Sequence, residues 1–285
     1  MRPSSPAAES ISRRCRPLLG TFVEIAVPRA FEQAINTAFD AVRHVHERMS
    51  FHEESSDLAT MRRAAAGHPV TVANETIAVL AAAIEFHRLS DGIFDVSVGR
   101  HLVAAGFLPR PPAVDLRRIT GTTADLEIVE DRQVVCNKPM LIDLGGIAKG
   151  YAVDRATAVL RSLGVPHGIV NAGGDLRAFG RDTQIVHLRG ADGRIDGVVA
   201  LTDSAMASSS NRHLRRTGRG RERSPHLDGR GRSILASDAI TVIAPDCMTA
   251  DAMTKIVLAD PPMGRVLLAR LGGTIVERAA GTRAA

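Results

Sequence analysis

Four short segments of the sequence place acidic residues or glycines where a strand is expected to end. They are Phe94-Asp95, Asp143-Leu144-Gly145-Gly146, Gly173-Gly174-Asp175 and the segment around Asp251. Glycines let a ligand approach the backbone, and carboxylate and carbonyl oxygens are the donors that Mg²⁺ prefers. Together with Lys149, His226 and an arginine-rich segment, these residues predict a site for a phosphorylated ligand with a divalent metal.

The most informative segment runs from Leu141 to Asp154 and reads L-I-D-L-G-G-I-A-K-G-Y-A-V-D. A short apolar run ends at Asp143, two glycines follow, and a helical pattern begins near Lys149. The helix N-terminus and the lysine both carry positive charge, which suits a phosphate or pyrophosphate. Neither G-x-x-x-x-G-K-[ST] nor G-x-G-x-x-G is present. A plain strand-to-helix turn with a solvated lysine is therefore the alternative interpretation.

The composition is that of an ordinary globular protein with few aromatic residues. The chain has 285 residues, of which 45% are hydrophobic, 24% charged and 3% aromatic, enough to form a sizeable core. Cys15, Cys136 and Cys247 lie far apart and show no metal-binding spacing, which favours a reducing compartment. No run approaches the roughly 20 apolar residues of a membrane span, and Pro17 and Glu24 interrupt any signal core. We therefore expect a cytoplasmic protein without a membrane span.

Basic residues are concentrated in one segment, although the formal net charge of the whole chain is only +5. Residues 212–232 contain eight arginines and few apolar residues. This segment is either a solvated loop or a surface for an anionic ligand. Because no aromatic residues are interleaved with the arginines, we do not expect nucleic-acid binding.

The expected elements mix helices and strands without a strict βαβ alternation, which predicts an α+β fold with mixed or antiparallel sheets packed with helices. We expect a disordered lead over residues 1–16 and a single domain over residues 17–285. Apolar periodicity predicts helices over Phe31–Met49, Leu58–Ala66, Asn74–Leu89, Tyr151–Leu163, Thr249–Leu258 and Met263–Leu271. Strands are predicted over Gly20–Val27, Leu126–Val129, Gln133–Cys136, Met140–Ile142, Gly168–Asn171, Gln184–Leu188, Gly197–Leu201, Ile240–Ala244 and Thr274–Val276. Residues 206–211 are predicted to form a serine-rich loop.

Several motifs occur in an order that resembles one known family. They are L-L-G-T-F-V-E-I from Leu18, S-F-H-E-E-S-S-D-L from Ser50, G-I-F-D-V-S-V-G from Gly92, the Leu141 segment, V-N-A-G-G-D from Val170, the His226 segment and T-A-D-A-M-T-K from Thr249. This series resembles the FAD:protein FMN transferases, the ApbE-like family, from about Leu18 to the C-terminus. The resemblance implies an ApbE-like α+β fold that binds FAD and Mg²⁺. It also implies transfer of FMN from FAD to a Thr or Ser hydroxyl of an acceptor protein, with release of AMP.

The resemblance further implies roles for individual residues. The Mg²⁺ ligands would be the Gly146 carbonyl, the Asp251 carboxylate and position 255, where the family often has a small residue or Thr and this chain has Lys255. Because a lysine side chain has no acceptor atom, either its main-chain carbonyl binds the metal or its ammonium group contacts the phosphates. A solvent-facing lysine is the third possibility.

Catalysis would rest on His226 and Lys149, with His226 as general base and Lys149 beside the diphosphate. The family usually continues from its histidine as H-I-I-D-P-R-T-G, whereas this chain reads H-L-D-G-R-G, so that one residue and the proline are missing. FAD contacts would come from Leu19, His52, Ile93, Phe94, Asp95, Asp143, Lys149, Gly173, Gly174, Asp175 and Leu227. His52 stands where many relatives carry Tyr, and Asp175 either contacts the ligand or only caps a turn.

Two other functions stay open at this point. Water could replace the acceptor hydroxyl, which would make the chain an FAD pyrophosphatase. The altered residues around His226 and Lys255 could also leave a flavin-binding module without catalysis. The sequence does not identify the acceptor protein.

Overall fold

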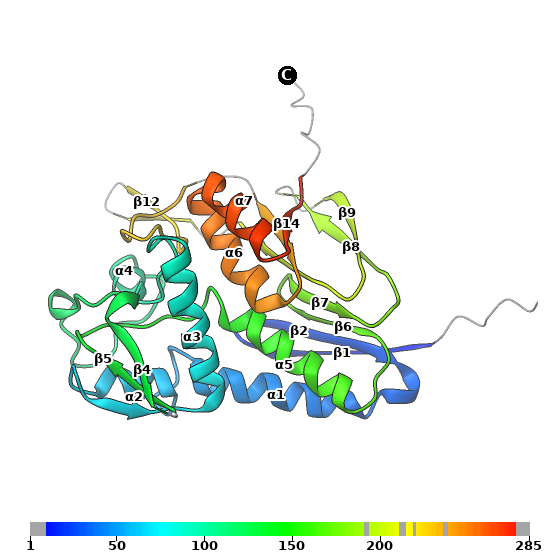
Figure 1. Ribbon diagram of the computed structural model, residues 1–285, viewed down its shortest axis with the longest axis horizontal. Helices are drawn as coiled ribbons and strands as arrows, with labels where there is room; N and C mark the ends of the chain where they lie inside the picture. Colours follow the sequence, from blue (N-terminus) through cyan, green and yellow to red (C-terminus); the bar gives the residue numbers. More distant parts are fainter. Residues whose placement is uncertain are drawn as a thin grey trace, which may run out of the picture.

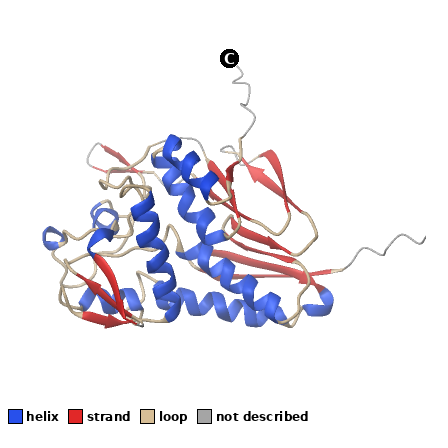
Figure 2. Cartoon of the chain, in the orientation of Figure 1, coloured by secondary structure: helices blue, strands red, loops and turns tan. Residues whose placement is uncertain are grey.

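The computed structural model describes residues 10–130, 132–190, 194–210, 215–218, 221–235 and 239–277. The fold is α+β, as predicted, and has a larger part built on one antiparallel sheet and a smaller part built mainly from helices (Figures 1 and 2). One cluster of buried apolar side chains runs through both parts, from Val23 in the sheet to Leu80 and Val134 in the smaller part. The two parts therefore share a core.

Seven strands form the main sheet, and every neighbouring pair is antiparallel. In spatial order they are β1 (Ile11–Leu18), β2 (Thr21–Pro28), β6 (Gly168–Ala172), β7 (Asp175–Phe179), β10 (Ala205–Ser209), β13 (Ile240–Ala244) and β14 (Thr274–Ile275). The inner strands are buried on both faces, and β10 is buried or half-buried throughout. Both faces of the sheet must therefore be covered.

Helices cover one face of this sheet and a hairpin covers the other. The helices are α1 (Ala34–Met49), α5 (Ala148–Ser162), α6 (Cys247–Ala259) and α7 (Pro261–Arg270), which lie in front of the strands in Figure 1. The hairpin of β8 (Gln184–Arg189) and β9 (Ile195–Leu201) buries Leu188, Val199 and Leu201 against Leu176 and Met206 on the opposite face. This arrangement fixes β7, α5 and α6 side by side, and the charged side chains described below come from these elements.

The smaller part packs against α1 through α3 (Asn74–Leu89). It contains α2 (Asp57–Arg63), α4 (Gly99–Ala104) and a three-stranded sheet in the order β3 (Pro69–Thr71), β5 (Gln133–Cys136), β4 (Leu126–Glu130). A short hairpin of β11 (Arg216–Gly218) and β12 (Arg221–Arg223) lies near α4, and three 3₁₀ helices span Arg29–Phe31, Leu116–Arg118 and Thr123–Asp125.

Most of the predicted elements are present within one to three residues of their expected ends. The helix over Asn74–Leu89 has the predicted bounds, and the predicted pairs Leu126–Val129 with Gln133–Cys136 and Gln184–Leu188 with Gly197–Leu201 are antiparallel hairpins. The predicted strand over Met140–Ile142 is reduced to a single bridge between Leu141 and Val98.

Two predictions about irregular segments are wrong. Residues 11–16 belong to β1, whose side chains alternate between exposed and half-buried, so the strand is held by its backbone ladder to β2 rather than by apolar burial. The expected lead therefore does not extend to residue 16, and residues 1–9 lie outside the described residues. The serine-rich stretch Ala205–Ser209 is the inner strand β10, which pairs with β7 and β13 and packs against α6. Of the rest of that predicted loop, Ser210 is outside any strand, and Asn211 lies outside the described residues.

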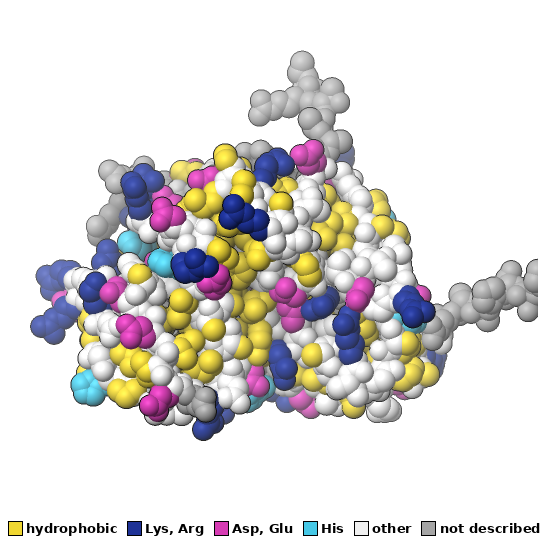
Figure 3. Space-filling model, in the orientation of Figure 1, with side chains coloured by type: hydrophobic (Ala, Val, Ile, Leu, Met, Phe, Trp, Pro, Cys, Tyr) yellow, Lys and Arg dark blue, Asp and Glu magenta, His cyan; other side chains and the backbone are white. Residues whose placement is uncertain are grey.

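The surface shown in Figure 3 mixes basic and acidic side chains over the visible face. Among the described residues of this face, basic side chains form no continuous stripe. Within the described ranges, none of the helices has the length and apolar character needed to cross a membrane.

Candidate active site

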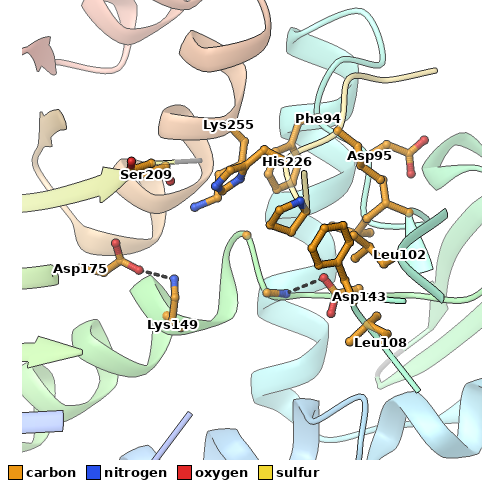
Figure 4. A pocket seen from close by; sticks show the side chains of 18 of the residues that line it. Phe94, Asp95, Leu102, Leu108, Asp143, Lys149, Asp175, Ser209, His226 and Lys255 are labelled. Carbon is orange, nitrogen blue, oxygen red and sulfur yellow. Dashed lines mark hydrogen bonds and ion pairs between the residues drawn. The ribbon is translucent and has the colours of Figure 1, made fainter. Parts of the chain in front are cut away.

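A cavity of about 570 Å³ lies where β7, α5 and α6 meet the smaller part of the molecule. Eleven of the residues predicted for the site line this cavity: Ile93, Phe94, Asp95, Asp143, Gly146, Lys149, Gly173, Asp175, His226, Leu227 and Lys255. These residues come from segments that are more than 150 positions apart in the sequence. The structure therefore brings the predicted segments together (Figure 4).

Four predicted residues do not line the cavity. Asp251 is fully buried directly behind Lys149 and Lys255, and Gly174 lies in the turn before β7. Leu19 lies in the β1–β2 turn with a positive φ of 55° and packs on the core. His52 is exposed and does not line the cavity.

The charged end of the cavity is a cluster of two lysines and two aspartates. Lys149 Nζ donates to Asp175 Oδ2 and, over 3.2 Å, to Asp251 Oδ2, while Lys255 Nζ donates to Asp251 Oδ1. Both carboxylates are buried, with exposed fractions of 2% for Asp175 and 0% for Asp251, whereas the two lysines remain partly exposed to the cavity. The ammonium groups are therefore the charges that a ligand meets first.

The electrostatics of the cluster follow from this burial. Burial alone would raise the pKa of Asp251, but the charges of Lys149 and Lys255 outweigh it and hold that pKa below its usual range. Burial and the neighbouring Asp251 charge raise the pKa of Asp175. The two carboxylates raise the pKa of Lys149 despite its burial, so Lys149 is charged at every physiological pH.

The position of Lys149 depends on a close approach between α5 and α6. The backbone N–H of Gly150 donates to Asp251 Oδ2 over 3.2 Å. One turn further along α5, Asp154 accepts hydrogen bonds from the first N–H groups of α6, those of Cys247 and Met248, at 3.0 and 2.8 Å. Asp154 also forms an ion pair with Arg177 on β7, at 2.7 Å, so one carboxylate ties together the three elements that carry the cluster.

The glycines before Asp175 form a hairpin turn rather than a strand-to-helix corner. Gly173 and Gly174 connect β6 to β7 and have φ values of 65° and 102°, which L-residues rarely adopt. Asn171 Oδ1 accepts the N–H of Gly174 at 2.9 Å, which leaves the Asp175 side chain free to meet Lys149. The Asp175 carboxylate therefore pairs with Lys149, and its contact with a ligand stays a prediction.

His226 lies on the other side of the cavity from the lysines. Its Nε2 is buried and has no hydrogen-bond partner within the described part of the chain, and the ring is also bonded to the backbone of Ser210. Burial, and then the charges of Lys255 and Lys149, lower the pKa of His226 to about 4. The imidazole is therefore neutral at physiological pH and has a lone pair available to accept a proton.

The segment after His226 is shorter than the family pattern but is internally organised. Asp228 Oδ1 accepts the N–H groups of Arg230 and Arg232 at 3.0 and 2.9 Å, and Asp228 Oδ2 pairs with the Arg232 side chain at 2.8 Å. Gly229 packs so tightly on Gly92 that a Cβ there would lie 1.9 Å from the Gly92 carbonyl oxygen. The loop that carries His226 is thus held by Asp228 without the missing proline.

The opposite end of the cavity is apolar, and the sequence analysis did not identify the residues that form it. Val98, Leu102, Phe107 and Leu108 line this end beside Phe94, and Arg216 stands at its edge with its guanidinium 5.1 Å from the centre of the Phe107 ring. The arginine-rich segment was the signal for Arg216, but no arginine within it was singled out. Ser208, Ser209 and Ser210 were missed because their stretch was predicted to be a loop.

Two acidic residues of the cavity are engaged locally. Asp95 Oδ1 accepts hydrogen bonds from the backbone and side chain of Ser97 and from the Thr123 hydroxyl, at 2.6–2.8 Å, and so shapes the turn after Phe94. Asp143 Oδ2 accepts the Gly145 N–H at 3.3 Å, and burial raises the pKa of Asp143. Asp143 therefore keeps most of its acceptor capacity for a ligand.

The three residues expected to bind magnesium converge, but their donor atoms do not suit that ion. A Cβ on Gly146 would lie 3.4 Å from Lys255 Cε, so these two residues are in contact, and Lys255 in turn reaches Asp251. Both Asp251 oxygens already accept from an ammonium group, and the Lys255 side chain offers no lone pair. Among the described residues there is also no group of three or more His, Cys, Asp or Glu side chains that could hold a metal ion.

Comparisons with known proteins identify the family to which this chain is similar. The family model for the ApbE family matches residues 19–275. The chain is 26% identical over 253 residues to the FAD:protein FMN transferase of Klebsiella pneumoniae (strain 342), which covers 84% of this chain and 79% of that protein. It is 29% identical over 244 residues to the enzyme of the same name from Vibrio cholerae serotype O1, covering 79% and 72%.

Solved structures extend the likeness to the fold. The crystal structure of the ApbE protein from Thermotoga maritima superposes with a TM-score of 0.83 at 25% identity, over 95% of this chain and 97% of that one. The flavin transferase ApbE from Vibrio cholerae superposes with a TM-score of 0.79 at 25% identity, over 94% and 93%. Because sequence and fold agree over nearly the whole length, this chain belongs to the ApbE family.

Proposed function

We propose that this protein transfers FMN from FAD to a Thr or Ser hydroxyl of an acceptor protein and releases AMP. The observation that carries the proposal is the cavity itself, in which two ammonium groups face a buried histidine nitrogen for which the described residues provide no hydrogen-bond partner. The relatives named FAD:protein FMN transferase support it, and the ApbE family model matches residues 19–275, the range that contains Lys149, His226 and Lys255.

The two ends of the cavity suit the two parts of a flavin nucleotide. The diphosphate would lie at the charged end, where Lys149 and Lys255 offer N–H donors and positive charge. The ring system would lie against Phe94, Leu102 and Leu108 at the apolar end. Magnesium takes no part in this proposal, because the Asp251 carboxylate is already bonded to both lysines.

The chemical step follows from where the charges and the proton acceptor lie. The acceptor hydroxyl oxygen forms a bond to the phosphorus on the FMN side of the diphosphate. The bond from that phosphorus to the bridging oxygen breaks, and AMP leaves with the bridging oxygen. His226 Nε2 takes the hydroxyl proton, and the ammonium groups stabilise the negative charge that grows on the departing phosphate.

The test is a flavinylation assay with the purified chain, FAD and a candidate acceptor peptide. Intact mass of the peptide would detect the added FMN, and chromatography would detect AMP in equal amount. Since a general base typically contributes about 10²–10⁴-fold, His226→Ala should lose that factor in transfer rate while it retains FAD binding. His187→Ala, an exposed histidine on β8, is the matched control and should transfer FMN normally. Normal transfer by His226→Ala would show that His226 is not the base.

Two alternatives predict different products in the same assay. An FAD pyrophosphatase would release AMP and free FMN without any acceptor. A flavin-binding module would bind FAD and form neither AMP nor a modified peptide. The cytoplasmic location stays a prediction, and fractionation of the native protein would test it.

A further inference from the structure

The place where the resemblance puts a metal ion is already filled by a side chain. The stem of Lys255 runs across Gly146, with Cε, Cγ and Cδ at 3.4, 3.6 and 3.8 Å from a Cβ built on that glycine. Its ammonium group then donates to Asp251 Oδ1. The cation therefore lies between the two residues that would otherwise be expected to ligate magnesium.

Among the described residues, the second Asp251 oxygen and the adjacent hydroxyl of Thr254 are also engaged. The second oxygen of Asp251 accepts from Lys149 and from the Gly150 N–H, both at 3.2 Å. The adjacent hydroxyl, Thr254 Oγ1, is buried and bonded to Ser209 Oγ and to the Asp251 carbonyl, both at 2.7 Å. Magnesium demands near-octahedral oxygen coordination, and these contacts leave no side-chain oxygen of the expected set unbonded.

Lysine is rare in this chain, in which nearly all basic residues are arginines. Only three of its 36 basic residues are lysines, namely Lys138, Lys149 and Lys255. Two of these three meet on one buried carboxylate. Lysine provides a compact point charge with three donors, whereas arginine provides a wide planar fork, so lysine is the side chain that comes nearest to a small cation.

We propose that the Lys255 ammonium group replaces the divalent cation, so that this protein binds the FAD diphosphate and transfers FMN without a metal. The inference rests on the proposed function only for the transfer step. In that step Lys255 and Lys149 stabilise the charge on the departing AMP phosphate, and the bonds made and broken are those given above. Arg216 adds a third positive charge at the edge of the same cavity.

Whether this site binds a divalent cation can be measured without any flavin. In titrations of Mn²⁺ followed by electron paramagnetic resonance, the wild-type protein should bind no ion at this site. Lys255→Thr removes the ammonium group, frees Asp251 Oδ1 and adds a hydroxyl, and it should gain one Mn²⁺. Stoichiometric Mn²⁺ binding by the wild type that is abolished in Asp251→Asn would overturn the proposal.

Binding of FAD gives a second, independent readout. Affinity for FAD should change by less than about twofold between EDTA and excess Mg²⁺ in the wild type, since no ion enters the site. In EDTA, Lys255→Thr should bind FAD about 10- to 100-fold more weakly than the wild type, because it loses a charged hydrogen-bond donor. Addition of Mg²⁺ should restore FAD binding by this variant. Lys255→Met keeps the length of the side chain and should weaken FAD binding to a similar extent. It replaces Lys255→Thr in this measurement if Lys255→Thr does not fold.

Controls and transfer assays separate this inference from the proposed function. Lys138→Thr removes an exposed lysine that pairs with Asp125, and its FAD affinity should equal that of the wild type in both buffers. Transfer that occurs only with Mg²⁺ would refute the metal-free site and leave the proposed function standing. EDTA-insensitive FAD binding without transfer in any buffer would refute the proposed function and leave the metal-free site standing.

Discussion

Gly150 lies against the first turn of α6 so closely that a Cβ on it would stand 2.2 Å from the carbonyl oxygen of Cys247. Only glycine fits at this contact without moving one of the two helices. The same approach lets the Gly150 N–H reach Asp251 and places Lys149 beside it. The glycine after Lys149 is therefore explained by helix packing.

Gly150→Ala should destabilise the protein and loosen the lysine cluster. Overpacking of this kind typically costs about 1–3 kcal/mol, and here the obstacle is backbone, which cannot rotate away. Urea unfolding measures the loss. Ser162→Ala, an exposed position on the same helix, is the control and should change stability by less than about 0.5 kcal/mol. Equal stability of the two variants would contradict the close contact.

The burial of His226 predicts a pH dependence of stability with a definite sign. Its pKa is about 4 in the folded protein and 6.5 when unperturbed, so the unfolded chain binds the proton more readily between these values. Stability should therefore fall as the pH falls from 6.5 towards 4, by on the order of 2 kcal/mol at pH 5 from this group alone. His226→Gln lacks the effect. Urea unfolding at pH 7, 6 and 5 should show the wild type losing more stability than His226→Gln, and parallel losses would count against a neutral buried imidazole.

Long periodic elements were predictable from the sequence, whereas the cavity was predictable only in part. The helix over Asn74–Leu89 has enough apolar periodicity to define both of its ends. The strand Ala205–Ser209 carries Ala and Ser, which have low strand propensity, and its neighbours β7 and β13 impose its conformation. The three serines at the cavity were missed for that reason.

The residues of the charged cluster could be named from motifs, but their mutual contacts could not. Lys149, Asp175 and Asp251 lie in three separate motifs, and only the packing of α5 between β7 and α6 brings them together. The apolar end of the cavity, including Leu102 and Leu108, carries no local signal, because such residues occur equally in any core.

The carboxylate of Asp154 should be among the most costly groups to remove outside the cavity. It satisfies two N–H groups at the start of α6 and pairs with the mostly buried Arg177. Asp154→Ala would leave this arginine unpaired, which typically costs about 3–5 kcal/mol. Urea unfolding should show this loss, and the double variant Asp154→Ala/Arg177→Met should lose less than the sum of the two single variants. Asp182→Ala, at an exposed position, is the control.

The loop after His226 should depend on the acceptor oxygen of Asp228 and hardly on its charge. Asp228 Oδ1 accepts two backbone N–H groups, whereas the ion pair of Asp228 with Arg232 involves a guanidinium that is 72% exposed and contributes little. Asp228→Ala should release the loop, misplace His226 Nε2 and lower the rate of FMN transfer by on the order of 10- to 100-fold, with folding retained. Asp228→Asn keeps an oxygen that accepts the same N–H groups and should retain the rate within about threefold. Single-turnover transfer rates, with circular dichroism to check folding, distinguish the two variants. Equal losses would show that the charge of Asp228, rather than its hydrogen bonds, positions the histidine.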